Sequence, residues 1–100
     1  MNISDLKLAD KHASDKAVSA QQLFKATNNT ATSLQILAGE RLKEHTSPVP
    51  ALLLCVEGEV HYGEPDGRNV RLLPGNYVLI EPDVVHFVDG IKSSQLVLFR

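Results

Sequence analysis

From residue 39 onward, short apolar segments alternate with groups of turn-forming residues. The turn formers stand at Gly39, at Pro48 and Pro50, at Gly58 and in the later groups "GEPDG", "LPGN" and "EPD". The segments between them are rich in Val, Ile and Leu, which favour β-strands. Short strands bounded by turns about every eight to twelve residues are typical of sandwiches and barrels. The pattern therefore predicts an all-β domain.

Two segments show strand patterns most clearly. Residues 33–38 alternate, with Leu34, Ile36 and Ala38 on one face. Residues 51–56 ("ALLLCV") are apolar on both faces, which predicts a buried central strand. The full prediction is nine strands, the first of them at a sheet edge: 18–25, 33–38, 40–45, 51–56, 59–62, 70–73, 77–80, 84–88 and 95–99.

The first 17 residues have a different character from the rest of the chain. Their apolar residues form no clean stripe, although Ser4 could cap a short helix. The alternatives are a short helix and an extended arm that lies on the barrel or on a partner subunit, and the extended arm is favoured. The predicted organisation is an N-terminal arm at 1–17 followed by a single β-domain at 18–100.

Composition limits the classes of partner. The chain has 100 residues, 43% of them hydrophobic, and a net charge of −2. It has no basic cluster, which argues against nucleic acid, and Arg68 and Arg71 are assigned to a solvated turn. The longest apolar run is far shorter than the ~20 residues of a membrane-spanning helix, so we expect no membrane partner. A domain this small gains stability from an oligomer interface, and we expect a homodimer.

Cysteine usage indicates a compartment. Cys55 is the only cysteine, so no disulfide can form within the chain. A lone cysteine suits a reducing environment. Asp5, Asp10 and Asp15 interrupt the first twenty residues, unlike the apolar core of a secretory signal. These features predict a cytoplasmic protein, with Cys55 as an inert buried thiol within its apolar strand.

Two of the four histidines have ordinary interpretations. His12 lies in the polar arm and is expected to be solvated. His61 follows Val60 and precedes Tyr62 near a hairpin end. Strict strand alternation points the His61 ring away from the side of Val60 and Tyr62, so we expect His61 on an outer face.

The other two histidines are candidates for chemistry. In "VVHFV", His86 shares a face with Val84 and Val88. An unpaired polar group buried there would cost about 1–3 kcal/mol, so His86 is either a core histidine satisfied by a neighbour or a pocket or metal ligand. His45 ends its strand on the face of Arg41 and Lys43, which by itself predicts a solvent-facing ring.

Taken together, the spacing of these residues resembles the two motifs of the cupin family. The first motif, G-x5-H-x-H-x3–4-E-x6-G, is matched by Gly39, His45 and Gly58. The second, G-x5-P-x-G-x2-H-x3-N, is matched by Gly75 and His86. The stretches "LLLCVEGEV" and "LLPGNYVLIEP" are similar to sequences common in cupins. The resemblance covers roughly residues 33–100. The resemblance implies a cupin-type jelly-roll β-barrel or sandwich.

The departures from these motifs concern the metal ligands. In typical metal-binding cupins, two His and one Glu of the first motif and the His of the second hold a divalent ion. By position, His45 and His86 are two of these four ligands. The remaining motif positions hold other residues: Ser47 for the second His, Ala51 or Leu52 for the Glu, Glu81 and Asp83 for the Pro and Gly, and Gly90 for the Asn.

The chain also resembles a subgroup of small cupins with the pattern H-x-x-P-x-x-A-L, a single later His and mostly unassigned functions. His45, Pro48, Ala51 and Leu52 fit that pattern. Two imidazoles alone hold a divalent ion such as Zn, Fe, Mn or Ni only weakly, and Cys55 or Glu81 are conceivable replacement ligands. The predicted pocket consists of His45, Ser47, Leu53, Cys55, Val84, His86 and Val88, with His45 and His86 as the metal ligands.

Three functions are open at this point. The first is a binding cupin that holds a small molecule or a weakly bound divalent metal inside the barrel near His45 and His86. The second is a metal-dependent cupin enzyme of the isomerase or dioxygenase type. The third is a non-catalytic dimeric interaction module.

Overall fold

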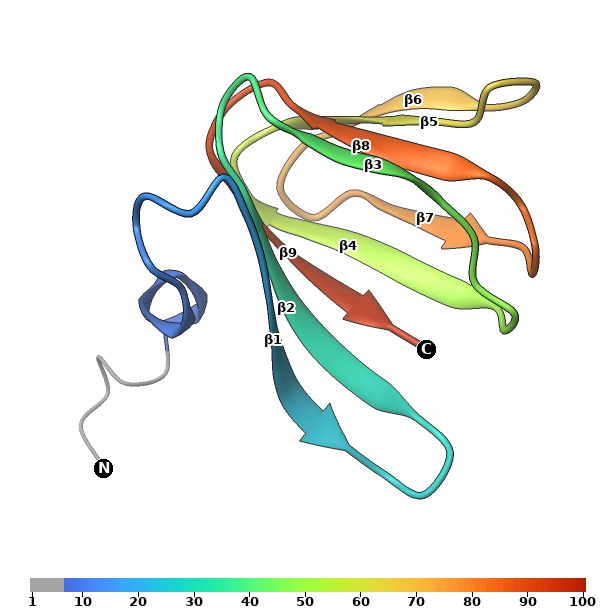
Figure 1. Ribbon diagram of the computed structural model, residues 1–100, viewed down its shortest axis with the longest axis horizontal. Coiled ribbons are helices and arrows are strands. Elements are labelled where there is room, and N and C mark those ends of the chain that lie inside the picture. Colours follow the sequence, from blue (N-terminus) through green and yellow to red (C-terminus); the bar gives the residue numbers. More distant parts are fainter. Residues whose placement is uncertain (1–6) are drawn as a thin grey trace.

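The computed structural model describes residues 7–100, and it consists of two antiparallel sheets packed face to face (Figure 1). Ser4, the expected helix cap, lies outside the described residues. The described part of the arm forms one 3-10 turn and is otherwise non-helical. The elements are η2 (Leu8–Lys11), β1 (Val18–Lys25), β2 (Thr30–Ile36), β3 (Arg41–His45), β4 (Ala51–Glu57), β5 (Val60–Gly63), β6 (Asn69–Leu72), β7 (Tyr77–Ile80), β8 (His86–Gly90) and β9 (Ser94–Phe99).

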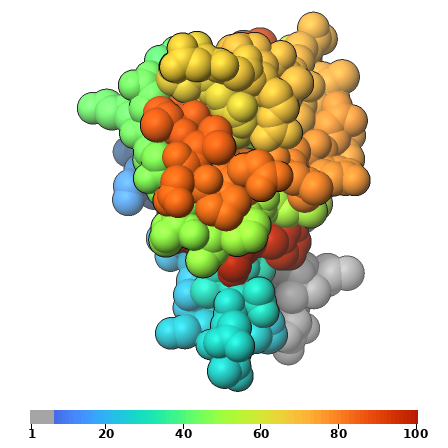
Figure 2. Space-filling view, turned by 90° about the vertical axis from the view of Figure 1, so that its right-hand side faces the viewer, coloured from blue at the N-terminus to red at the C-terminus, as the bar shows by residue number. Residues whose placement is uncertain are grey.

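The two sheets exchange strands along the chain. The larger sheet has the order β1-β2-β9-β4-β7, and the smaller has the order β3-β8-β5-β6. The chain crosses between the sheets after β2, β3, β4, β6, β7 and β8, as a jelly roll requires. The predicted all-β class and the edge position of β1 are confirmed. The turn between β1 and β2 projects below the rest of the sandwich (Figure 2).

The core lies between the inner faces of the two sheets. Side chains of a strand alternate between faces, so the residues of one face of each sheet point into it. The larger sheet supplies Leu34, Ile36, Ala51, Leu53, Cys55, Val78, Ile80 and Leu96, and the smaller sheet supplies Val60, Tyr62, Leu72 and Val88. Leu42 and Leu98 pack against this cluster from its margin.

The crossing between β4 and β5 depends on Gly58. Its backbone is left-handed, with φ of 89°. A Cβ atom at this position would also overlap the hydroxyl of Ser94, which donates to the Glu59 carbonyl beside the turn. Glycine satisfies both constraints, which is the physical reason for glycine at the end of the first motif.

Two strand predictions need correction. The strand predicted over 84–88 lies two residues later: β8 runs from His86 to Gly90, because Val84 and Val85 are not yet paired and Gly90 still pairs with Val60. The strand over 51–56 is not buried on both faces. Its inner residues are buried, whereas Leu52 and Leu54 on the outer face are only half-buried.

The prediction of a solvated His12 is wrong. Only 9% of His12 is exposed, and its ring bridges two buried hydroxyls on the outer face of the larger sheet. Nδ1 lies 2.7 Å from the Ser19 hydroxyl of β1, and Nε2 lies 2.8 Å from the Ser33 hydroxyl of β2. The arm is held further by Gln35, whose side-chain amide donates to the Ala13 carbonyl at 2.8 Å. His12 therefore anchors the arm to the sheet.

Among the described residues, no helix is long and apolar enough to cross a membrane.

We expect His12→Ala to lower the free energy of unfolding by about 1–3 kcal/mol, because the Ser19 and Ser33 hydroxyls lose their partner in a buried position. Burial, and then the nearby Lys16 ammonium, lower the pKa of His12 below its ordinary value of 6.5. Below about pH 6.5 the unfolded chain therefore takes up a proton that the folded chain resists, and His12 makes folding less stable as the pH falls.

The measurement is chemical denaturation at a series of pH values. The variant should lose stability at neutral pH and show a shallower decline in acid than the wild type. Lys11→Ala, at the exposed neighbouring position, is the control. Equal effects of the two substitutions at every pH would contradict the anchoring role of His12.

Candidate functional site

A β-bulge in β3 turns His45 toward the inside of the barrel. Leu42 pairs with Val88 of β8, but three residues further along, His45 pairs with His86, only two residues before Val88. One extra residue is therefore inserted in β3, and such a bulge reverses the face of every side chain beyond it. His45 is therefore on the same face as His86 and not on that of Arg41 and Lys43, although it is exposed, as expected.

The bulge places the two motif histidines in direct contact. The ring centroids of His45 and His86 are 4.2 Å apart, with the rings tilted by 60°. His86 is buried, with 4% of its surface exposed, whereas His45 is exposed. The pair thus spans the boundary between the core and solvent, at the end of the smaller sheet.

Each ring is oriented by a backbone carbonyl two residues earlier. The Nδ1–H of His45 donates to the Lys43 carbonyl at 2.8 Å, and that of His86 donates to the Val84 carbonyl at 2.9 Å. A carbonyl oxygen can only accept, so Nδ1 carries the proton in both rings. In a neutral imidazole this leaves a lone pair on Nε2, the arrangement in which histidine accepts a hydrogen bond or binds a metal.

The electrostatics favour the neutral form of His86. Burial lowers its pKa below the ordinary value, and the neighbouring His45 lowers it further, which together outweigh the opposing hydrogen bond to the Val84 carbonyl. The Nε2 lone pair of His86 is therefore available at neutral pH.

Behind the pair lies a hydrogen-bonded group that the sequence analysis missed. The Tyr62 ring stacks on His86, with centroids 5.8 Å apart. The Tyr62 hydroxyl donates to Glu64 Oε2 at 2.6 Å, and Arg68 Nη2 donates to the same oxygen at 3.0 Å. A buried tyrosine needs a hydrogen-bond partner, so the alternation that points Tyr62 inward, followed by Glu64, was the available signal. Arg68 is exposed at the turn, as expected, and in addition pairs with Glu64, which the sequence analysis did not foresee.

The Glu64 carboxylate is held in its charged form. Burial by itself would raise its pKa, but the hydrogen bonds from Tyr62 and Arg68 outweigh that effect and the pKa lies below its ordinary value. Burial, and then the hydrogen bond to Glu64, raise the pKa of Tyr62. Because both Glu64 oxygens accept hydrogen bonds from Tyr62 or Arg68, Glu64 serves to orient Tyr62 and is engaged rather than free to accept a substrate proton.

The remaining predicted pocket residues have other contacts. The Ser47 hydroxyl donates to the Val49 carbonyl at 2.9 Å. Leu53, Cys55 and Val88 are core residues with 2% exposure or less. Burial raises the pKa of the Cys55 thiol, as expected of an inert core cysteine. Val84 is half-buried and contributes its carbonyl to His86. His45 and His86 are in ring contact and Val84 binds His86, whereas Leu53, Cys55 and Val88 belong to the core cluster. A pocket role for these residues stays a prediction.

The residues present do not fit a tightly held metal ion. Between residues 7 and 100, no group of three or more His, Cys, Asp or Glu side chains is placed to share a metal. Cys55 and Glu81, the conceivable replacements, do not join the histidines in such a group. Two imidazoles leave at least two positions of a tetrahedral zinc shell, and four of an octahedral shell, without protein ligands.

The turn that carries His86 is built around Asp83. Among residues 7–100 Asp83 is the one non-glycine residue with a positive φ, at 63°. Its backbone amide donates to the Ser47 carbonyl at 2.8 Å, which joins the turn to the loop after β3. Asp83 occupies the glycine position of the second cupin motif, and aspartate is among the side chains that tolerate this conformation. The departure at Asp83 therefore preserves the turn.

Two hollows are lined by residues of this site or its neighbours. One, of about 430 Å³, is lined by the Glu64–Gly67 turn together with Val84 and Val85. Another, of about 510 Å³, is lined by Ala17, Val18 and residues 40–45, and it includes His45. A larger groove of about 740 Å³ lies on the outer face of the larger sheet and contains neither histidine. The chemistry of the histidines, rather than the size of the groove, identifies the candidate site.

Comparison with solved structures agrees with this architecture. A cupin superfamily protein from Desulfitobacterium hafniense superposes with a TM-score of 0.81 at 16% identity, over 92% of this chain and 84% of that one. An RmlC-like cupin from Shewanella frigidimarina gives 0.76 at 22% identity, over 83% and 74% of the two chains. A cupin-like protein from Thermotoga maritima gives 0.73 at 23% identity, over 89% and 73%. The chain therefore has the cupin fold.

Comparison by sequence gives no match: no protein-family model and no curated protein matches the chain. The similarity to cupins is thus carried by the arrangement of strands and by the few motif positions described above.

We expect Asp83→Val to lower the free energy of unfolding by about 1–2 kcal/mol, because a β-branched side chain is strained at positive φ. Asp83→Gly should be tolerated, since glycine adopts this conformation without a steric penalty. Denaturant unfolding measures both changes. Asp66→Val, the same substitution in an exposed turn without positive φ, is the control. If Asp83→Val is no more costly than Asp66→Val, the strain argument is wrong.

Proposed function

We propose that this cupin domain is a binding protein, and that it takes a small polar molecule or a weakly held divalent metal ion at His45 and His86. One observation carries the proposal: both Nδ1–H groups are committed to backbone carbonyls, so both Nε2 lone pairs are left for a ligand. A ligand that fits two such acceptors offers N–H or O–H groups, or is a Lewis acid. The proposal includes a reducing, cytoplasmic setting, which suits the free thiol of Cys55.

The position of the pair supports binding from solvent. His45 is exposed and His86 is buried beneath it, so a ligand reaches the first ring directly and the second by entering the end of the barrel. The stack of Tyr62 on His86 holds the inner ring in place, since Tyr62 is itself fixed by Glu64. A preorganised pair of acceptors loses little conformational entropy on binding.

A metal ion at this site would be held by His45 and His86 with the rest of its shell from water or a second ligand, and when bound it would supply a Lewis acid. The expected affinity is low because the protein provides two donors. Metal-dependent catalysis of the isomerase or dioxygenase type receives no specific support, since the Glu64 carboxylate is already engaged by Tyr62 and Arg68.

Calorimetric titration of the purified protein with Zn²⁺, and separately with Ni²⁺, tests the metal arm of the proposal. The expected result is weak binding to the wild type that falls at least about tenfold in His45→Ala and in His86→Ala, because each variant removes one of two ligands. His61→Ala is the matched control, since the His61 ring lies tilted beside Phe87 on the outer face of the smaller sheet and should not contribute.

The small-molecule arm is tested by the histidine ring signals in NMR during addition of small amides, amines and polyols. Signals of His45 and His86 should shift with a common binding curve while those of His61 stay in place. Metal that stays bound in stoichiometric amounts through dialysis against a chelator would contradict the weak site. Absence of any metal- or ligand-dependent change at both rings would contradict the proposal as a whole.

A further inference from the structure

A hollow of about 500 Å³ lies between β6 and β7, which stand at one end of the smaller and the larger sheet. The turn at residues 73–76 joins the two strands at one end of the hollow. Arg68 crosses between the sheets at the other end, where its Nη2 donates to the Leu79 carbonyl of β7. The volume is within the range of about 300–1,000 Å³ that small-molecule sites occupy.

Two arginines line this hollow, and among the described residues that line it there is no Asp or Glu. Each guanidinium is held by a carboxylate outside the lining. Arg68 Nη2 lies 3.0 Å from Glu64 Oε2, and Arg71 Nε lies 2.7 Å from Glu59 Oε2. With partners among residues 7–100, these contacts leave Nε and Nη1 of Arg68 and both Nη groups of Arg71 as donors. A fixed guanidinium with spare donors is suited to binding a carboxylate through two hydrogen bonds.

Asn76, in the turn before β7, adds a third donor to the lining. Its side-chain Oδ1 accepts from the Leu73 backbone N–H at 3.0 Å. Because a backbone N–H can only donate, this contact fixes which end of the amide is oxygen, and Nδ2 is left as a donor. Arg68, Arg71 and Asn76 therefore offer only donors to a ligand in the hollow.

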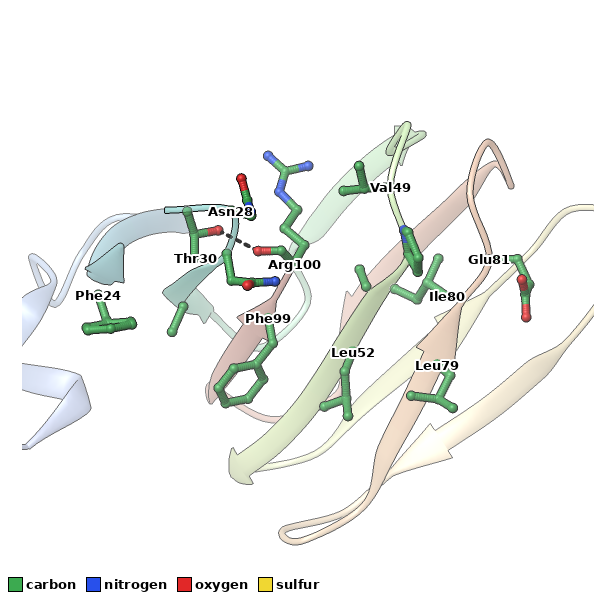
Figure 3. Close-up of a pocket in the computed structure, with 14 residues that line it drawn as sticks. Phe24, Asn28, Thr30, Val49, Leu52, Leu79, Ile80, Glu81, Phe99 and Arg100 are labelled. Carbon is green, nitrogen blue, oxygen red and sulfur yellow. Dashed lines mark hydrogen bonds between the residues drawn. The ribbon is translucent and has the colours of Figure 1, made fainter. Parts of the chain in front are cut away.

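The rest of the lining is largely apolar. It includes Val70 of β6 with Tyr77 and Leu79 of β7, which are 37%, 59% and 56% exposed. Leu79 also lines the larger groove of the neighbouring outer face (Figure 3). The Tyr77 ring offers a flat surface on which another ring can stack. An inorganic anion would leave this apolar wall unused, whereas an organic acid would cover it.

We propose that the hollow between β6 and β7 binds a small aromatic carboxylic acid. The carboxylate accepts hydrogen bonds from Arg71 and Arg68, and the ring lies against Tyr77 and Leu79. Both arginines remain charged at any physiological pH, so the site keeps its preference for an anion. Water competes for them, since 46% of the Arg68 side chain and 66% of the Arg71 side chain are exposed. Neither His45 nor His86 lines the hollow, so this inference does not depend on the proposed function.

The experiment follows the Nε–H signals of the arginines and the ring signals of Tyr77 by NMR while benzoate is added at constant ionic strength and neutral pH. The signals of Arg68, Arg71 and Tyr77 should shift along one common binding curve. Benzamide has the same ring without the charge, and inorganic phosphate has charge without a ring. Each should bind at least about tenfold more weakly than benzoate, because each loses either the charge-assisted hydrogen bonds or the apolar contact.

Arg71→Gln should weaken benzoate binding at least about tenfold, because glutamine removes the charge and the paired donors. Tyr77→Ser should weaken it through the loss of the ring contact. Both side chains are largely exposed, so the variants should keep the wild-type circular dichroism spectrum. Arg41→Gln is the matched control, since the Arg41 side chain is 47% exposed and pairs with Asp89 but does not line the hollow. It should bind benzoate as the wild type does.

The absence of any shift at Arg68, Arg71 and Tyr77 with millimolar benzoate would overturn the proposal. Folded Arg71→Gln and Tyr77→Ser proteins that bind benzoate as tightly as the wild type would overturn it too, because the ligand would then lie elsewhere. Benzamide or phosphate that binds as tightly as benzoate would refute the assignment to an aromatic carboxylate.

Discussion

The structure depends on the burial of two sheet faces against each other. Each sheet presents an apolar inner face, and the opposing sheet covers that face. The packing has a direct consequence for the polar residues that point inward. Tyr62 and His86 lie on the inner face of the smaller sheet, so each must find a hydrogen-bond partner inside the barrel or at its rim. Glu64 and the Val84 carbonyl are those partners, and they hold both rings in fixed positions.

The candidate site follows from this packing and from one inserted residue. The bulge in β3 brings His45 onto the inner side, where it meets His86 across the strand pair. Without the bulge, His45 would lie on the face of Arg41 and Lys43, and the two imidazoles would lie on opposite faces of the sheet. The turn at Asp83 completes the arrangement, because its bond to the Ser47 carbonyl joins the loop after β3 to the loop before β8. The site thus rests on local irregularities in an otherwise regular sandwich.

The outer face of the larger sheet has no second layer of the same kind. The arm is held on this face by hydrogen bonds, with His12 between Ser19 and Ser33 as the anchor. On the outer face of β4, Leu52 and Leu54 are half-buried in a strand whose sequence suggests complete burial.

The strands and turns, the glycine at the β4–β5 crossing and the motif positions of His45 and His86 could be predicted from the amino-acid pattern alone. These features are local: apolar alternation and turn residues act over a few positions, and a left-handed backbone demands glycine wherever it occurs. Only the tertiary structure decided which way His45 points, what buries His12, and how Tyr62, Glu64 and Arg68 join His86. Alternation predicts a side chain's face only while a strand stays regular, and the bulge in β3 depends on pairing with a strand some 40 residues away. Contacts such as that of His12 with Ser33 likewise arise from the register between distant segments, which periodicity along the chain does not encode.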